Sequence, residues 1–298
     1  MFRAPARQRP HEQVLKLADR RLLGYTEYGD PEGEPVLYFH GWPGSRLEAA
    51  AWDAPAKAAQ VRLVALERPG YGLSDFHPGH TIAGWPDDVA EAATLLGIEQ
   101  FSVVGYSGGG PYALACGARL AGRVCRVACV SSPSEITGSA SLAGMSVANR
   151  CLMVGARRAP WALGLPFGVM SMVVRRFPGL ATRAFSRADR TLLATRPGLE
   201  AVLLRSAQEA FRHGVRGAAD DGALLTRPWG FGLQEVSTEV LLWQGDADTQ
   251  VPPSMGRSLA SRLPHCSAEF IPGATHLWGP ANGAAVLAAM KAGRNSQL

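Results

Sequence analysis

Short, continuous apolar runs recur along the chain and alternate with segments of helical spacing. The clearest runs lie at residues 36–39 (VLYF), 61–66 (VRLVAL), 101–104 (FSVV), 127–130 (VACV) and 240–243 (VLLW), with a weaker one at 268–271. Residues 21–28 (RLLGYTEY) also predict a strand. Such runs are typical of strands covered on both faces. The stretches between them predict helices over residues 47–60, 87–96, 111–120, 254–262 and 284–291. The alternation predicts an α/β fold with a mostly parallel, doubly wound sheet.

The alternation stops between residues 134 and 238, where β-like runs are few and apolar residues recur at helical spacing. The sequence therefore predicts a core domain formed by residues 1–133 and 239–298, with a helical cap or lid inserted at residues 134–238. Residues 1–20 are predicted as a polar lead-in. Charge supports this division, because residues 134–238 hold 13 Arg, no Lys and seven acidic residues, whereas the remainder holds 17 basic and 18 acidic residues.

Composition excludes several classes of protein. A chain of 298 residues that is 47% apolar can bury a large core, which a disordered chain cannot. The net charge of +5 is modest for a chain of this size. A nucleic-acid-binding protein usually gathers its positive charge on one face or stripe beside aromatic residues, and no nucleic-acid partner is expected here. Five cysteines without metal-ligand spacing predict buried, reduced thiols, no metal, and a cytoplasmic location.

No apolar run reaches the length of about 18 residues that a transmembrane helix needs. The nearest approach is residues 160–174, which Pro166 interrupts and which pairs of arginines flank at 157–158 and 175–176. This segment is predicted to be an amphipathic or buried part of the lid. Interfacial contact with a membrane is the alternative.

A glycine-rich segment carries the first candidate chemistry. Residues 105–110 (GYSGGG) directly follow the run 101–104 and directly precede a predicted helix. A G-x-S-x-G nucleophile elbow needs this strand–turn–helix context. Glycines beside Ser107 remove Cβ atoms that would clash in a sharp turn, and a helix N-terminus favours developing negative charge. Ser107 is therefore predicted to be a nucleophile. A phosphate-binding loop is disfavoured, because no Lys-Ser or Lys-Thr follows the last glycine.

Further segments resemble motifs of the α/β-hydrolase family. They are residues 40–45 (HGWPGS), 67–74 (ERPGYGLS), 245–252 (GDADTQVP) and 273–278 (GATHLW). The resemblance covers about residues 20–290 and implies the α/β-hydrolase fold, with catalytic residues in the chain order Ser, Asp, His. Residues 220–231 also look like bacterial members, but the sequence assigns them no role.

The resemblance implies roles for individual residues. It makes Asp248 the acid and His276 the general base of a triad with Ser107. It also places the two N–H donors of an oxyanion hole on Trp42 and Gly108. For the acid, Asp246 and Glu135 stay as alternatives.

Other histidines have less support as functional residues. His40 is an alternative base, although it is expected to brace its loop instead. His77 and His80 are expected in a solvated loop rather than at a metal.

The predicted activity is a serine hydrolase that cleaves a carboxylic ester through an acyl-enzyme, without metal or organic cofactor. The substrate is expected to be a small acyl or ester molecule, with Trp161, Phe167 and Met170 of the cap either lining its pocket or only packing. The same triad would also suit a proline iminopeptidase-like, perhydrolase or C–C bond hydrolase reaction. A non-catalytic ligand-binding protein is the remaining alternative. The oligomeric state is not predicted.

Overall fold

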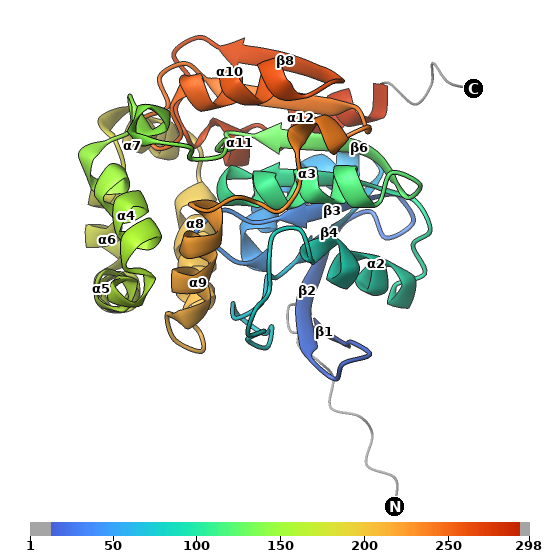
Figure 1. The fold of residues 1–298 in the computed structure, drawn as a ribbon, viewed down its shortest axis with the longest axis horizontal. Coiled ribbons are helices and arrows are strands. Elements are labelled where there is room, and N and C mark those ends of the chain that lie inside the picture. Colours follow the sequence, from blue (N-terminus) through green and yellow to red (C-terminus); the bar gives the residue numbers. More distant parts are fainter. Residues whose placement is uncertain (1–12, 293–298) are drawn as a thin grey trace, which may run out of the picture.

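An eight-stranded sheet lies at the centre of the computed structural model, which describes residues 13–292 (Figure 1). Its spatial order is β1-β2-β4-β3-β5-β6-β7-β8. The first two strands run antiparallel to their neighbours, and β3 to β8 are parallel. This confirms the predicted α/β fold with a mostly parallel sheet. The strands are β1 (Gln13–Lys16), β2 (Leu22–Gly29), β3 (Glu34–Phe39), β4 (Val61–Leu66), β5 (Phe101–Tyr106), β6 (Val124–Val130), β7 (Val240–Gly245) and β8 (Cys266–Ile271).

Both faces of the sheet are covered, because successive side chains of a strand point to opposite sides. In β3, Leu37 and Phe39 belong to the apolar cluster that includes residues of α2, α3 and α10, whereas Val36 and Tyr38 belong to the cluster with α1 and α12. The core helices are α1 (Asp53–Ala58), α2 (Trp85–Leu95), α3 (Gly110–Arg119), α10 (Pro253–Arg262), α11 (Trp278–Ala281) and α12 (Gly283–Ala292).

Two expectations about the N-terminal part need correction. Residues 1–20 are not all a lead-in, since β1 (Gln13–Lys16) pairs with β2 as an edge hairpin; residues 1–12 lie outside the described residues. The single helix expected over residues 47–60 is divided into the 3₁₀ helix η1 (Arg46–Trp52) and α1. Pro55 explains the division, because proline has no N–H to continue the hydrogen bonding of η1 and is tolerated only in the first turn of a new helix.

The thiols are also less buried than expected. All five cysteines are unpaired, but only Cys116 and Cys129 are buried, and Cys151 is exposed.

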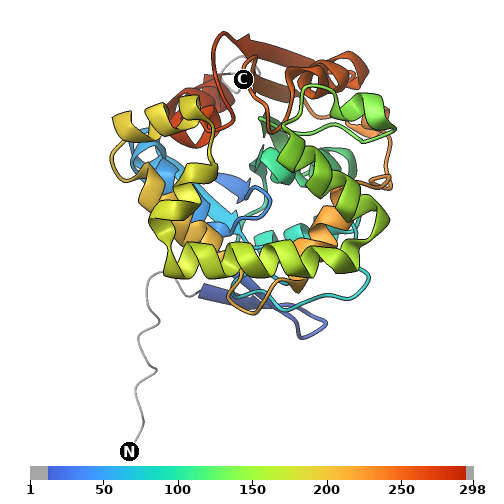
Figure 2. The ribbon, with the colours of Figure 1, turned by 90° about the vertical axis from the view of Figure 1, so that its left-hand side faces the viewer.

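The stretch between β6 and β7 contains helices and connecting segments, and no strand among its described residues. We call this stretch the insertion. It lies together at one side of the sheet, at the left in Figure 1, and faces the viewer in Figure 2. None of the helices in residues 13–292 has the length and apolarity that spanning a bilayer requires. The helices of the insertion are α4 (Val147–Arg158), α5 (Gly164–Arg176), α6 (Pro178–Ala181), α7 (Arg187–Thr195), α8 (Leu199–Ala210) and α9 (Arg216–Leu225).

Candidate active site

Ser107 lies in a strained turn at the carboxyl end of β5. Its φ is +49°, a left-handed conformation that costs free energy for a residue with a Cβ. The turn closes because its neighbours are glycines. A Cβ on Gly105 would lie 2.4 Å from the carbonyl oxygen of Gly109, and one on Gly109 would lie 2.2 Å from that of Phe39. Packing around the turn therefore holds the Ser107 hydroxyl at the edge of the sheet, directly before α3.

Three residues far apart in the sequence form a chain of hydrogen bonds at this edge. His276 follows β8, and its Nε2 lies 3.0 Å from Ser107 Oγ. Its Nδ1 lies 2.8 Å from Asp248 Oδ2, in the turn after β7. Because the carboxylate only accepts, the proton lies on Nδ1, and Nε2 is free to accept from the serine hydroxyl. All three side chains are buried.

The Asp248 carboxylate is fixed from two sides. Its Oδ1 accepts the N–H groups of Gln250 (2.8 Å) and Val251 (3.0 Å). Its Oδ2 accepts from the Gln244 side chain at 3.2 Å as well as from His276. The turn therefore directs one oxygen at the imidazole and uses the other to hold the carboxylate in place.

The surroundings of His276 act on its pKa in opposite directions. Burial lowers it, since the charged form loses solvation. The negative charge of Asp248 and the hydrogen bond to it raise the pKa, and Asp189 and Glu48 add to this. The net effect is a pKa above the ordinary value, so these surroundings stabilise the imidazolium form of His276.

The alternative acids lie elsewhere. Asp246 is exposed and accepts the N–H of Gly273 at 2.7 Å. Glu135 forms an ion pair with Arg262 at 3.0 Å. His77 and His80 stack on each other, and residues 13–292 contain no group of three or more His, Cys, Asp or Glu side chains arranged to hold a metal ion.

The two candidate oxyanion donors lie next to each other. A Cβ on Gly108 would lie 2.6 Å from Trp42 Cβ and 3.3 Å from Trp42 N. Within residues 13–292, neither the Trp42 N–H nor the Gly108 N–H donates a hydrogen bond to protein. Both donors are therefore free to bind an oxygen beside Ser107.

Arg68 fixes the orientation of the Trp42 N–H from behind. This arginine, at the end of β4, donates Nη1 to the carbonyl of His40 and Nη2 to that of Gly41 at 3.0 Å. The C=O and N–H of a trans peptide point in opposite directions. Holding the Gly41 carbonyl toward Arg68 therefore turns the N–H of the same peptide, that of Trp42, to the other side.

His40 strengthens this arrangement. Its Nδ1 lies 2.9 Å from the Gly41 carbonyl, and its Nε2 accepts the backbone N–H of Arg68 at 3.3 Å. Burial, and then the charge of Arg68, hold the pKa of His40 well below its usual value, so the ring stays neutral. His40 is thus placed as a brace of the loop, with both ring nitrogens engaged away from Ser107.

Asp221, on α9 of the insertion, holds Arg68 in turn. Its Oδ2 accepts from Arg68 Nη2 at 2.8 Å and Nε at 3.1 Å, and the hydroxyls of Tyr71 and Tyr112 donate to the same carboxylate. Arg68 and Asp221 are both buried. The sequence had singled out residues 220–231 without a role; the buried ion pair supplies one.

Comparison with known proteins places this chain in a family. The model of the alpha/beta hydrolase family matches residues 36–289, which include every residue of the site described above. The chain belongs to the alpha/beta hydrolase family. Membership supports an enzyme of the hydrolase class.

Two curated relatives of this alpha/beta hydrolase match over shorter stretches. One is a proline iminopeptidase from Xanthomonas citri, 33% identical over 112 residues, 36% of this chain and 35% of the relative. Another is a bifunctional esterase/perhydrolase from Acinetobacter calcoaceticus, 37% identical over 91 residues, 29% of this chain and 32% of the relative. The matches thus span about a third of the length of these relatives.

Among solved structures, a thermophilic esterase from Thermogutta terrifontis superimposes with a TM-score of 0.68 at 20% identity. The superposition covers 95% of this chain and 98% of that one. At this identity, the likeness shows the shared fold.

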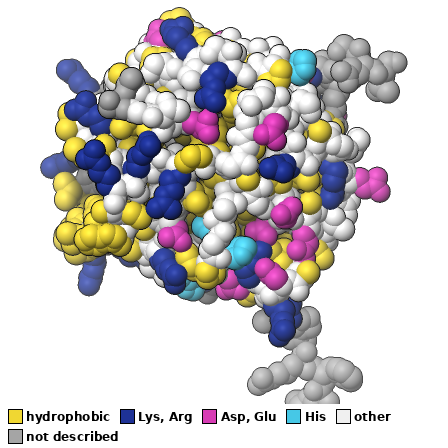
Figure 3. All heavy atoms as spheres, in the orientation of Figure 1, with side chains coloured by type: hydrophobic (Ala, Val, Ile, Leu, Met, Phe, Trp, Pro, Cys, Tyr) yellow, Lys and Arg dark blue, Asp and Glu magenta, His cyan; other side chains and the backbone are white. Residues whose placement is uncertain are grey.

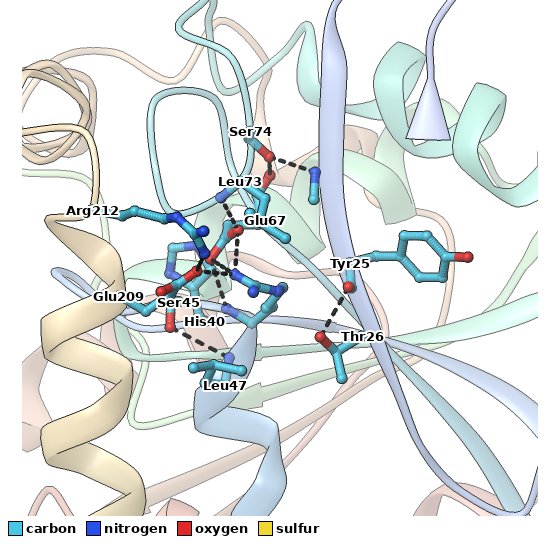
Figure 4. Close-up of polar contacts among 12 residues, drawn as sticks. Tyr25, Thr26, His40, Ser45, Leu47, Glu67, Leu73, Ser74, Glu209 and Arg212 are labelled. Carbon is cyan, nitrogen blue, oxygen red and sulfur yellow. Dashed lines mark hydrogen bonds and ion pairs between the residues drawn. The ribbon is translucent and has the colours of Figure 1, made fainter. Parts of the chain in front are cut away.

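Further contacts join the core of this alpha/beta hydrolase to the insertion (Figure 4). Buried Arg46 pairs with Glu67 at 2.8 Å and with Glu209 of α8 at 2.7 Å. The backbone N–H of Ser45 donates to the hydroxyl of Ser206, also on α8, at 2.9 Å. The insertion is therefore attached through the loop that carries Trp42 and the segment directly after it.

The three cap residues considered for substrate binding lie in different surroundings. Phe167 is fully buried, with its ring edge-on to that of Trp42 at 5.5 Å between centroids. The Trp42 ring also donates to the Ala218 carbonyl at 2.7 Å. Trp161 is 84% exposed and Met170 is 37% exposed. Of the three, Phe167 alone contacts a candidate site residue among the described contacts.

One buried carboxylate beside the site was not singled out from the sequence. Glu48 in η1 accepts the N–H of Gly41 at 2.8 Å and the hydroxyl of Tyr38 at 3.2 Å. Burial raises its pKa to about 7. An acidic residue within an Ala-rich stretch was the only signal in the sequence.

Replacing Arg68 with methionine is expected to damage both stability and catalysis. The variant leaves Asp221 buried without its cation, which costs about 3–5 kcal/mol of unfolding free energy. It also frees the Gly41 carbonyl, so kcat for a hydrolysed substrate should fall by about 10²-fold with little change in KM. Urea unfolding and steady-state kinetics measure the two effects.

Arg62→Met is the matched control for this change. Arg62 pairs with Glu27 at the surface, with 20% and 26% of the two side chains exposed, so its loss should cost about 1 kcal/mol or less. If Arg68→Met keeps full kcat in the folded protein, the proposed positioning of Trp42 is wrong.

Proposed function

We propose that this chain is a serine hydrolase that cleaves carboxylic esters through an acyl-enzyme, with Ser107, His276 and Asp248 as its catalytic triad. The observation that carries the proposal is the continuous hydrogen-bonded chain from Ser107 Oγ to His276 Nε2 and from Nδ1 to Asp248, at 3.0 and 2.8 Å. Two free N–H groups beside the serine complete the set of parts that acyl transfer needs.

The mechanism follows from these positions. His276 takes the Ser107 proton as the oxygen attacks the ester carbonyl, and Asp248 stabilises the imidazolium. The oxyanion accepts from the N–H groups of Trp42 and Gly108. His276 then gives its proton to the departing alcohol, and water that it activates releases the acid from Ser107. Every step uses groups of this chain.

We propose in addition that the insertion acts as a lid over this site. Support comes from Trp42, whose ring contacts the insertion at two points, Ala218 and Phe167. The contact between the rings of Phe167 and Trp42 makes Phe167 the best placed of the three cap candidates to contact an acyl group.

A panel of p-nitrophenyl esters of rising chain length tests the proposed reaction. We expect turnover with an initial burst of nitrophenol equal to the enzyme concentration. A fluorophosphonate should stop turnover, and mass spectrometry should locate the adduct on Ser107. Turnover of proline β-naphthylamide without ester hydrolysis would assign the aminopeptidase reaction instead. Binding of esters without turnover of any acyl compound would make the chain a binding protein.

The pH profile gives a second prediction. His276 must be neutral to accept a proton, and its pKa is raised from the usual 6.5, so activity should fall at pH values below a midpoint that lies above 6.5. The measurement is kcat/KM against pH for a soluble ester.

Glu48, with a pKa of about 7, titrates in the same range and requires a control. In Glu48→Gln the acidic limb should persist, shifted to slightly lower pH, because one negative charge near the imidazole is gone. Loss of the limb in this variant would assign the titration to Glu48 rather than to His276.

A further inference from the structure

Helix α5 is apolar on two sides but packs with only one. Phe167 and Val174 face inward and are buried. Leu165, Val169 and Met172 are 77%, 49% and 52% exposed. Their spacing of four and three residues places them along one line of the helix surface. A surface helix normally shows polar residues on its outer side, so this exposed stripe needs an explanation.

The stripe belongs to a larger apolar face. Trp161, before α5, is 84% exposed, and Phe177 and Leu180, after it, are 56% and 51% exposed. Figure 3, drawn in the orientation of Figure 1, shows hydrophobic side chains gathered at the lower left, where α5 lies. Large contiguous apolar patches of this kind mark interaction surfaces. We call the six residues Trp161, Leu165, Val169, Met172, Phe177 and Leu180 the α5 face.

The surroundings of the α5 face are strongly basic. Residues 147–196 contain nine Arg, no Lys and a single acidic residue, Asp189. Asp189 is buried, where it accepts from Ser186 at the start of α7. All nine arginines are exposed, and none of them forms an ion pair with a carboxylate within residues 13–292. Dark blue side chains accordingly lie beside the yellow patch in Figure 3.

We propose that the α5 face binds the surface of an anionic lipid bilayer. Exposed tryptophan, phenylalanine and aliphatic side chains enter the boundary between headgroups and acyl chains, and arginines around them meet the acidic headgroups. The helix would lie in the plane of the surface, because α5 spans only Gly164–Arg176 and its other side packs against the protein.

Charge favours a lipid surface over a second copy of the chain. A two-fold symmetric dimer places the same patch on both sides of the interface. Arginines such as Arg158 and Arg176 would then face arginines, with no exposed carboxylate in residues 147–196 to compensate. Like charges across an interface oppose association. An anionic surface satisfies both the apolar and the basic character of the patch.

Vesicle flotation with the full chain tests the proposal. The protein should float with vesicles of phosphatidylcholine and phosphatidylglycerol, and should stay behind with phosphatidylcholine alone. Raising the salt from about 0.1 M to about 1 M should weaken binding, since the screening length falls from about 10 Å to about 3 Å. Replacing Leu165, Val169 and Met172 together with glutamine should weaken binding at least tenfold, with hydrolysis of a soluble ester unchanged.

Two control variants locate the binding surface. Val14→Gln with Leu95→Gln alters exposed apolar residues outside the insertion, and it should bind like the parent. A variant in which Arg158, Arg176 and Arg183 are all changed to glutamine should lose its binding to the acidic vesicles. The same change at Lys57, Arg119 and Arg257 removes as many exposed charges from core helices and should have little effect.

Three results would overturn the proposal. One is the absence of flotation with acidic vesicles. Another is equal loss of binding in the two sets of charge variants, which would mean general attraction of a basic protein. The third is a dimer in analytical ultracentrifugation that the glutamine variant of α5 abolishes, without vesicle binding. None of these results depends on the proposed ester chemistry, because the ester assay and the vesicle assay are separate.

Discussion

Ser107→Ala is expected to lower kcat for p-nitrophenyl ester hydrolysis by about 10⁶-fold, because the residues of a triad act as a unit and loss of the nucleophile removes the covalent route. The residual rate comes from binding and the oxyanion donors alone. Alanine fits the turn, since the Cβ of Ser107 is already accommodated at a φ of +49°. The folded state and KM should therefore change little, and the burst of nitrophenol should vanish.

Ser102→Ala is the matched control for this prediction. Ser102 is also buried, on the same strand β5, but lies outside the hydrogen-bonded chain to His276. It should retain kcat within about twofold, as ordinary substitutions away from the reacting groups do. If Ser107→Ala keeps more than a small fraction of the parent rate, another nucleophile performs the reaction and the proposed function fails.

Asp248→Asn is expected to reduce kcat by about 10⁴-fold while leaving the geometry intact. The asparagine amide can donate to Nδ1, which favours the imidazole tautomer with its proton on Nε2. In that tautomer His276 cannot accept the proton of Ser107. The substitution also removes the largest contribution that raises the pKa of His276, so the imidazolium formed during attack loses its stabilisation. Steady-state kinetics on the same esters measure the loss.

Asp246→Asn provides a control two residues away in the same turn. Asp246 is exposed, and its contact is with the N–H of Gly273, which an asparagine oxygen can still accept. Its kcat should stay near that of the parent. Loss of activity in Asp246→Asn together with retained activity in Asp248→Asn would show that Asp246, and not Asp248, is the acid of the triad.

The sequence predicted the strands well because each buried parallel strand is a short apolar run with little ambiguity. Phe101–Tyr106 and Val240–Gly245 were located to within a few residues for this reason. The edge strand Gln13–Lys16 was missed, since it is half exposed and alternates weakly. The helical interruption at Pro55 was also missed, although proline gives a local signal.

The sequence allowed some residues of the site to be predicted but not others. Ser107 has a local signature of glycines between a strand and a helix, so its turn was predicted from short-range constraints. The partnership of Arg68 with Asp221 has no such signature, because 153 residues separate the two and only tertiary packing brings them together. The exposure of Trp161 and Met170 could not be predicted either, because the sequence does not show which side of a helix packs against the rest of the protein.

The buried bridge between Arg68 and Asp221 has a consequence for evolution and for protein engineering. One half of it belongs to the sheet domain and the other to α9, so neither half is satisfied alone. A chimaera that grafts the helices of a relative onto this sheet must bring an equivalent carboxylate at the same place, or the graft will inherit an orphaned guanidinium beneath the loop of residues 40–45. Recombination should therefore succeed when its crossover points keep α9 with its native strands or when the new helix carries that carboxylate, and libraries that shuffle α4 to α7 alone should yield more active progeny than libraries that replace α9 without it.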